Sequence, residues 1–195
     1  MEREVLLTGI GGQGVQLAAR TLAVAAVHDR REVMVFGTYG GSMRGGNTDA
    51  TLVIGDQPLT TPPTIDHAWS AIAMHHEYWP DMRDRVIRGG LVVIDSSVFR
   101  GEVGLPDATV LEVEATRIAT DLGNARSASM VALGAFAAAS RLVGLEALVT
   151  SAYEVLPSYR TQHADANALA LRTGWEQVPT CIGPAWLSDA EVVAP

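Results

Sequence analysis

The stretch from Val5 to Val15 reads VLLTGIGGQGV, and it decides the fold. Its apolar start predicts a short strand that stops at glycine, and the alanine-rich segment Val15 to Val27 repeats apolar residues with helical spacing. Residues 9–14 between them satisfy the pattern G-x-G-x-x-G where a strand meets a helix. Strand, glycine-rich turn and helix therefore follow one another in the order typical of an α/β domain.

The rest of the chain continues this alternation. A second apolar run predicts a strand that completes a right-handed βαβ unit. We expect strands at Val33–Phe36, Thr48–Ile54, Ser70–Met74, Leu91–Ile94 and Val110–Val113, and helices at Glu77–Arg88, Ala115–Leu122, Ser127–Val143, Leu145–Tyr153 and from about His163. The predicted fold is a three-layer, Rossmann-like α/β domain over residues 1–178, with a mostly parallel sheet and helices on both faces. Residues 179–195 are expected to form an irregular tail.

Composition limits the classes of function. The 195 residues are 48% hydrophobic and 18% charged, which is typical of a globular protein, and the net charge of -8 argues against nucleic acid or an anionic membrane as partner. The apolar stretch Ala128 to Ala139 is too short to cross a bilayer core of about 30 Å, so it predicts a buried helix. Met1 to Leu7 lacks the features of a secretory signal. Cys181 is the only cysteine, so the chain cannot ligate an iron-sulfur cluster alone, and a reducing cytoplasm is the expected location.

The first glycine motif predicts an anionic ligand. Glycines allow the backbone to approach a phosphate, and the free amides at the start of a helix favour negative charge. The candidate binding residues are Gly9, Gly11, Gly12, Gln13 and Gly14. The alternative is that these glycines only allow close packing of strand and helix.

A nicotinamide dinucleotide makes a further demand on the sequence. Its ribose needs an acidic residue near the end of the second strand. This chain has Gly37 and Thr38 there, and Glu32 lies before the strand instead of after it. An NAD(P)-binding enzyme therefore stays an alternative because of the glycine motif, but the missing acidic residue argues against it.

A second glycine-rich segment, residues 39–47, reads YGGSMRGGN and follows the second predicted strand. Ligand crevices of α/β sheets form at the carboxyl ends of strands, so both glycine-rich segments are expected to face one crevice. Arg44 offers a planar fork of donors, and Tyr39 offers an aromatic face with a hydroxyl. We therefore add Tyr39, Arg44, Gly45 and Gly46 to the candidate binding residues, with a flexible surface loop as the alternative.

Together the two segments resemble the gamma subunits of the pyruvate/2-oxoacid:ferredoxin (flavodoxin) oxidoreductases. The resemblance covers nearly the whole chain: it continues through Gly89-Gly90, through Asp95-Ser96, and through the run MVALGA at residues 130–135. It also includes Asn167-Ala168-Leu169 and Gly174. One departure is Ser129, where the family often has asparagine before the Met-Val-x-Leu-Gly run.

The resemblance implies a subunit of an enzyme that is inactive alone. Such complexes convert a 2-oxoacid, coenzyme A and oxidised ferredoxin to acyl-CoA, carbon dioxide and reduced ferredoxin. Thiamine diphosphate, Mg and [4Fe-4S] clusters are expected on partner alpha and beta subunits, with delta as a further candidate. This chain is expected to hold no cofactor alone, to contribute to the coenzyme A site through its two glycine-rich segments, and to carry no catalytic residue. Pyruvate, 2-oxoglutarate, branched-chain 2-oxoacids and indolepyruvate all stay open as substrates, and in isolation the chain could form a homodimer.

Three further groups of residues have side chains that could carry chemistry. The set His67, His75, His76 and Glu77 lacks a helical i, i+4 histidine pair, so no metal site is predicted. Residues 95–97, Asp-Ser-Ser, are expected to cap the next turn more often than to touch a ligand. Cys181 has no obvious neighbouring base, which argues against a nucleophile. A purely structural subunit, whose glycines dock against a partner's backbone, is the remaining alternative.

Overall fold

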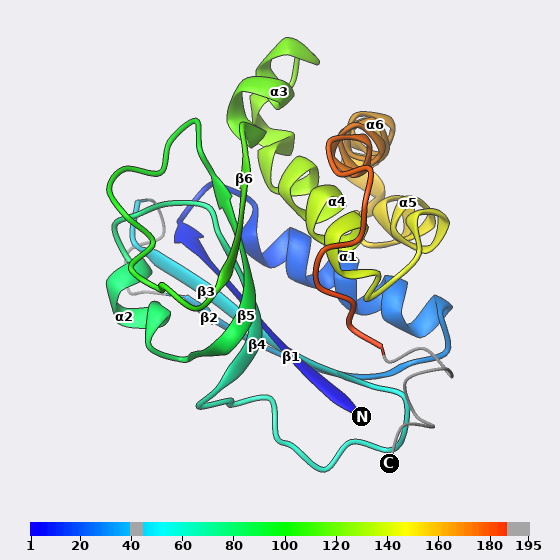
Figure 1. The fold of residues 1–195 in the computed structure, drawn as a ribbon. Coiled ribbons are helices and arrows are strands. Elements are labelled where there is room, and N and C mark those ends of the chain that lie inside the picture. The colour runs from blue at the N-terminus through cyan, green and yellow to red at the C-terminus, as the bar shows by residue number, and fades with distance from the viewer. Residues whose placement is uncertain (40–44, 187–195) are drawn as a thin grey trace.

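The computed structural model describes residues 1–39 and 45–186. Its centre is a six-stranded sheet in the order β2-β3-β1-β4-β5-β6 (Figure 1). The strands are β1 (Glu2–Ile10), β2 (Glu32–Tyr39), β3 (Asn47–Gly55), β4 (Ala68–Ala73), β5 (Val86–Asp95) and β6 (Thr109–Val113). Every strand expected from the sequence is present in the sheet, and most extend one to three residues further than the apolar runs suggested.

The sheet is mostly parallel, as predicted, with one strand reversed. Strands β1, β4, β5 and β6 pair in parallel, while β3 pairs antiparallel with both β1 and β2. Strand β2 therefore runs in the direction of β1 without touching it. The βαβ unit predicted at the start of the chain is present, but β3 lies between its two strands.

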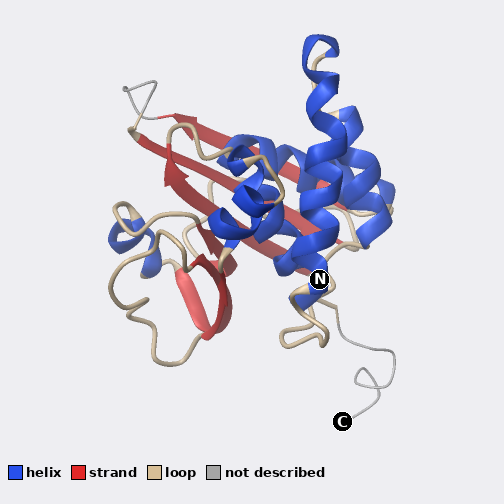
Figure 2. Cartoon of the chain, turned by 90° about the horizontal axis from the view of Figure 1, so that it is seen from above, coloured by secondary structure: helices blue, strands red, loops and turns tan. Residues whose placement is uncertain are grey.

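Helices cover both faces of the sheet unequally. One face carries α1 (Val15–His28), α4 (Ala128–Ser140), α5 (Leu145–Glu154) and α6 (Ala164–Glu176), with α3 (Ala115–Asp121) against α4. The other face carries the short α2 (Trp79–Arg83) and the loops 56–67 and 96–108, whose apolar residues form a second, smaller core. Figures 1 and 2 show the large helical layer on one side and α2 on the other. Short 3-10 helices, η1 (Ala125–Ser127) and η2 (Ser158–His163), precede α4 and α6.

The predicted helix over Glu77–Arg88 is wrong in its second half. Helix α2 ends at Arg83, and β5 begins at Val86, which pairs with Ala68. Gly89 has φ +74°, and the backbone of Gly90 lies too close to the Trp69 carbonyl for a side chain. These two glycines allow β5 to begin before its apolar run. The sequence did not indicate this extension, because residues 77–88 have apolar residues at helical spacing.

Helix α4 is the central helix of the large core. All thirteen of its residues are buried, which confirms the buried helix predicted for the apolar stretch. It crosses α6 through two glycines: a Cβ on Gly134 would lie 2.1 Å from the Leu171 carbonyl oxygen, and one on Gly174 would lie 2.0 Å from that of Val131. The two helix backbones are therefore in direct contact.

The segment after α6 packs against α4 without regular structure up to residue 186. The amide of Ile182 donates to the Ala139 carbonyl at 2.9 Å, and Trp186 Nε1 donates to the Leu142 carbonyl at 3.0 Å. The rest of the predicted tail lies outside the described residues. Among the helices that are described, none is both long and apolar enough to span a membrane.

The glycine contact between α4 and α6 predicts an unusual mutational result. Alanine normally stabilises a helix interior by about 1 kcal/mol over glycine. Gly134→Ala should instead lower the free energy of unfolding by about 1–3 kcal/mol, because its methyl group would overlap the Leu171 carbonyl. Urea denaturation measures this. Gly183→Ala is the control, because its Cβ would meet only Leu91 atoms at 3.7 Å or more; equal stability of Gly134→Ala and wild type would contradict the packing.

Candidate site at the glycine-rich turns

The first glycine motif forms the turn from β1 to α1. Gly9 and Ile10 end the strand, residues 11–14 turn, and Gly14 caps α1 with φ 81°. Gly12 has φ +107°, a conformation that only glycine adopts without strain. No oxygen of the described residues accepts a hydrogen bond from the amides of Gly12, Gly14 or Val15. The turn thus has the free backbone donors that an anion requires.

The two glycine-rich segments lie side by side at one edge of the sheet. The Gly11 amide donates to the Gly46 carbonyl at 2.8 Å, and the Gly45 amide donates to the Gly11 carbonyl at 3.4 Å. These bonds continue the β1–β3 pairing beyond Ile10 and Asn47. The second segment reaches the first through β3, because β2 is not adjacent to β1.

The other two candidate residues of the second segment are Tyr39 and Arg44. Tyr39 is the last residue of β2, and its backbone pairs with Thr48 at the same edge of the sheet. Arg44 lies outside the described residues.

The glycines of the two turns divide into two kinds. A Cβ on Gly9 would lie 2.7 Å from Gln13 Oε1, and a Cβ on Gly14 would lie 2.5 Å from Ser129 Oγ. These two glycines therefore allow close packing within the chain. Gly12 and Gly45 have positive φ, yet in the described part of the chain no atom beyond their sequence neighbours lies within 4 Å of a Cβ built on either. Packing does not explain Gly12 and Gly45, whose open side a ligand or partner could approach.

Gln13 braces the turn from inside. Its Oε1 accepts from the Ile10 amide at 2.9 Å, and its Nε2 donates to the Met74 carbonyl at 3.1 Å. The side-chain amide thus ties the end of β1 to the end of β4. Gln13 was predicted to bind the ligand, and its geometry here is that of a residue that holds the turn in shape.

Replacing Gln13 should loosen the turn. In Gln13→Ala the Ile10 amide and the Met74 carbonyl both lose their partner, so we expect a loss of about 1–2 kcal/mol of stability. Amide hydrogen exchange at Ile10 should rise with it. Gln162→Ala changes an exposed glutamine and serves as the control. Unchanged exchange at Ile10 would show that Gln13 is not the brace.

Gln16 and Gly37 were missed by the sequence analysis. Gln16, in the first turn of α1, donates through Nε2 to the Asp49 carbonyl at 2.6 Å. A Cβ on Gly37 would lie 2.3 Å from Gln16 Oε1, so glycine in β2 makes room for this side chain. Gln16 and Gly37 together fix the start of α1 over β2 and β3. This contact depends on how the strands are arranged in space, so the sequence alone does not predict it.

An acidic residue, Asp49, lies beside the glycine turns at this edge of the sheet. It lies opposite both Thr8 and Thr38 in the strand register, and its Oδ2 accepts from Asn47 Nδ2 at 2.6 Å. Burial raises the pKa of the Asp49 carboxyl, and the hydrogen bond from Asn47 offsets part of that rise. Because only 6% of Asp49 is exposed, it is poorly placed to bind a ribose. Glu32 begins β2 at the opposite edge, where the sequence analysis placed it.

The three other groups of residues have structural partners. Asp95 accepts from the amides of Ser97 and Thr116, so it caps both the next turn and the start of α3. The rings of His75 and His76 stack 4.3 Å apart, and burial is the main cause that lowers the pKa of His75. Cys181 Sγ contacts the Ala139 carbonyl at 3.1 Å. Within the described residues, no three His, Cys, Asp or Glu side chains come together as metal ligands.

A strand, a glycine-rich turn and a helix at the carboxyl edge of a mostly parallel sheet define an α/β domain of the Rossmann-like class. Comparison with known proteins identifies a family within this fold class. Residues 4–177 match the family model described as pyruvate ferredoxin/flavodoxin oxidoreductase. The chain belongs to this family, as its motifs predicted, and corresponds to the gamma-type subunits.

Two curated relatives match over nearly their full length. The 2-oxoglutarate synthase subunit KorC of Methanocaldococcus jannaschii is 29% identical over 179 residues, which cover 90% of this chain and 94% of the relative. The pyruvate synthase subunit PorC of Methanothermobacter thermautotrophicus is 30% identical over 179 residues, which cover 90% and 95%.

Two solved structures share the fold. One is the gamma subunit of a keto/oxoacid ferredoxin oxidoreductase from Geobacter sulfurreducens, with TM-score 0.74, 24% identity, and coverage of 90% of this chain and 98% of that one. The other is the 2-oxoglutarate:ferredoxin oxidoreductase from Magnetococcus marinus with 2-oxoglutarate, coenzyme A and succinyl-CoA bound, with TM-score 0.80 and 18% identity. The matched region covers 93% of this chain and 33% of the larger Magnetococcus chain.

Proposed function

We propose that this chain is the gamma subunit of a thiamine-diphosphate-dependent 2-oxoacid:ferredoxin oxidoreductase that acts in the cytoplasm. The observation that carries the proposal is the near-complete match to relatives named as single subunits of 2-oxoglutarate and pyruvate synthases. The complex would convert a 2-oxoacid and coenzyme A to acyl-CoA and carbon dioxide and pass the electrons to ferredoxin. This chain supplies part of the coenzyme A site and of the subunit interface.

The redox cofactors belong on partner chains in this proposal. An iron-sulfur cluster needs several thiolates, whereas this sequence has one cysteine, and that thiol lies against the Ala139 carbonyl. The residues present therefore do not fit a cluster. Thiamine diphosphate, Mg and [4Fe-4S] clusters are assigned to alpha and beta subunits, with delta as a further candidate, and ferredoxin is the acceptor of the whole complex.

The coenzyme A contribution is assigned to the joined glycine turns. Free amides at Gly12, Gly14 and Val15 can donate to phosphate oxygens, and the dipole of α1 adds positive potential at the same point. The open side of Gly12 and Gly45 lets a ligand approach the backbone closely. The Magnetococcus structure, which shares the fold, has coenzyme A bound somewhere in its complex.

Two other functions make different predictions. The glycine motif is consistent with a free NAD(P)-dependent enzyme. However, Asp49, the acidic residue beside the glycine turns, is buried and cannot easily reach a ribose. Titration with NADH should give no energy transfer from tryptophan if the proposal holds. In a purely structural subunit the open side of Gly12 and Gly45 would face a partner's backbone instead of a ligand, so the variants of Gly12 should leave coenzyme A affinity unchanged.

Reconstitution tests the proposed assembly. The isolated chain should show no 2-oxoacid oxidation, because thiamine and the electron carriers are on other chains. Adding the thiamine-bearing subunits should give 2-oxoacid-dependent and coenzyme A-dependent reduction of ferredoxin or a dye, measured by absorbance. Full activity of the complex without this chain, or activity of this chain alone, would refute the proposal.

Two glycine substitutions, one in the turn and one in a distant loop, test whether the turn binds coenzyme A. Gly12→Ala places a methyl group on the open side of the turn, so the reconstituted complex should bind coenzyme A about tenfold more weakly by calorimetry. Gly101→Ala is a matched control, because Gly101 also has positive φ and open space around its Cβ but lies in the loop on the other face. Both variants should lose similar stability from backbone strain. Equal coenzyme A affinity for the two would favour the structural subunit.

A further inference from the structure

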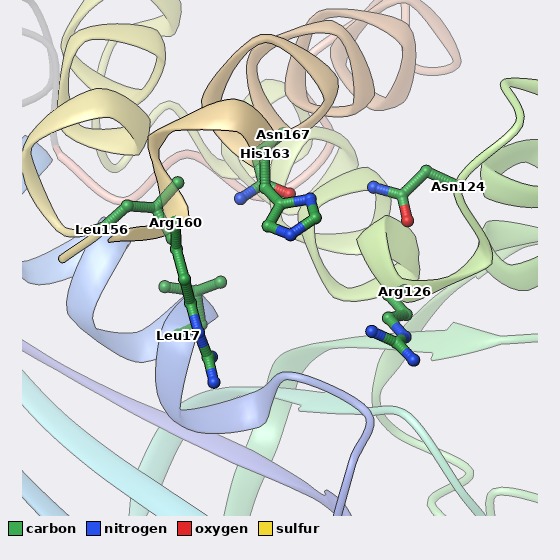
Figure 3. A pocket seen from close by; sticks show the side chains of 7 residues that line it. All are labelled: Leu17, Asn124, Arg126, Leu156, Arg160, His163 and Asn167. Carbon is green, nitrogen blue, oxygen red and sulfur yellow. The ribbon is translucent and has the colours of Figure 1, made fainter. Parts of the chain in front are cut away.

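Two concave sites lie in the helical layer, at opposite ends of α1. The pocket in Figure 3, which Arg126, Arg160 and His163 line together with Leu17, adjoins the first turn of α1 and therefore belongs with the glycine turns. The second pocket, of about 440 Å³, lies where α1 ends, between the end of α4, the start of α5 and the last turn of α6. It lies beside the start of β2, so a partner that binds there leaves the glycine turns uncovered.

Two arginine–tryptophan stacks form walls of this second pocket. The Arg31 guanidinium lies over the Trp186 ring, with Cζ 4.1 Å from the ring centroid. The Arg141 guanidinium lies over the Trp175 ring, with Cζ 4.5 Å from its centroid. Trp186 is held in turn by the hydrogen bond from its Nε1 to the Leu142 carbonyl. A guanidinium that stacks by its face keeps the N–H groups along its edge for other partners, so this Arg–Trp pocket presents two oriented sets of donors.

Neither arginine of the Arg–Trp pocket is neutralised by a described residue. All 14 basic residues of the sequence are arginines, the net charge is -8, and four other arginines form ion pairs with carboxylates. Within residues 1–39 and 45–186, the side chains of Arg31 and Arg141 form no ion pair and donate no hydrogen bond. The Asp56 carboxylate, which interacts electrostatically with Arg31, is paired with the terminal amine of Met1. The pocket is thus a basic spot on an acidic protein.

Arg141 also holds a backbone conformation that glycine usually takes. It follows the last residue of α4 with φ 53° and ψ 28°, in the left-handed region. Glycine is the common residue at such a helix end, because a side chain in this conformation costs energy. The dipole of α4 favours a cation here, and stacking on Trp175 adds to it, but neither uses the donors of the guanidinium. A partner that binds those donors would account for arginine at this position.

Asp29 adds one acceptor beside these donors. Its Oδ2 accepts from the Gly144 amide at 2.6 Å, at the N-cap of α5, and its Oδ1 has no hydrogen-bond donor in the described part of the chain. A small free anion would be repelled by this carboxylate. A peptide segment with acidic side chains suits the set better, because its carboxylates can bind the arginines while one of its backbone amides donates to Asp29.

We propose that the Arg–Trp pocket binds an acidic segment of a partner subunit, whose carboxylate side chains are held by Arg31 and Arg141. The inference rests on the proposed function, which makes this chain a subunit, and deepens it by assigning one contact surface. Arginine and tryptophan carry much of the binding energy of protein interfaces, and a guanidinium can hold a carboxylate through two parallel hydrogen bonds. Charge complementarity favours an acidic protein segment, whereas the net charge of -8 would repel a nucleic acid.

Assembly of the complex tests this surface. The double variant Arg31→Gln, Arg141→Gln should bind the other subunits about tenfold more weakly or worse, measured by interferometry on the full chain. Added salt should weaken the binding of wild type more than that of the double variant, because the variant has lost the charged contacts. Arg30→Gln is the matched control, because Arg30 is exposed and has φ 59°, close to that of Arg141, but does not line the pocket.

A glycine variant separates binding from folding. Arg141→Gly removes the guanidinium and the left-handed strain together, so its thermal unfolding midpoint should equal or exceed that of wild type. It should still bind the other subunits several-fold more weakly, about as Arg141→Gln does. A lower midpoint together with unchanged binding would show that the stack on Trp175 serves only the fold, and would overturn the inference.

A short acidic peptide keeps this inference separate from the proposed function. Tetraglutamate should change the tryptophan fluorescence of the isolated full chain saturably, and should bind the double variant about tenfold more weakly, whereas tetraglutamine should not bind. Free 2-oxoglutarate should bind wild type more weakly than the peptide does; equal or tighter binding would overturn the partner segment in favour of a small carboxylate.

The remaining outcomes also decide the matter. No saturable tetraglutamate binding to wild type, or the same binding to the double variant, would overturn the inference. A double variant that assembles like wild type into an active complex would overturn it as well, yet leave the proposed function standing. If the assembled subunits oxidise no 2-oxoacid, the proposed function fails, and the peptide result still decides whether the pocket binds acidic segments.

Discussion

The antiparallel strand β3 is the constraint on which the rest of the structure depends. It lies between β1 and β2, and at its start the Gly11 amide donates to the Gly46 carbonyl. This pairing brings the second glycine-rich segment against the first, although the strand that precedes it is not a neighbour of β1. Paired neighbours in a sheet lie about 4.8 Å apart, so this pairing holds the two segments close enough to present one surface.

The start of α1 is fixed from several directions, which matters because free amides bind an anion well only when they are held in place. Gln13 ties the turn to the end of β4, Gln16 ties the first helical turn to β3, and Gly14 lets the N-terminus of α1 approach Ser129. The Ser129 Oγ is buried without a partner in the described part of the chain, so this side chain serves packing.

Much of this fold could be predicted from local patterns. The turn after Val5–Thr8, the helix from Val15 and the buried helix over residues 128–139 each follow from short stretches of sequence, and all three are present. The helix expected over residues 77–88 was wrong because pairing with Ala68 draws Val86 into a strand. The division of glycines into packing and open positions depends on atoms distant in sequence, such as Ser129 beside Gly14.

Hydrogen exchange in the assembled complex, with and without saturating coenzyme A, measures whether the two glycine turns bind the ligand. If both glycine turns bind the ligand through their backbone, amide exchange should slow in the peptides that cover residues 9–17 and 45–50. The loop 96–108 on the other face should keep its exchange rate. Protection of one peptide alone, or of neither while the complex is turning over coenzyme A, would contradict the account.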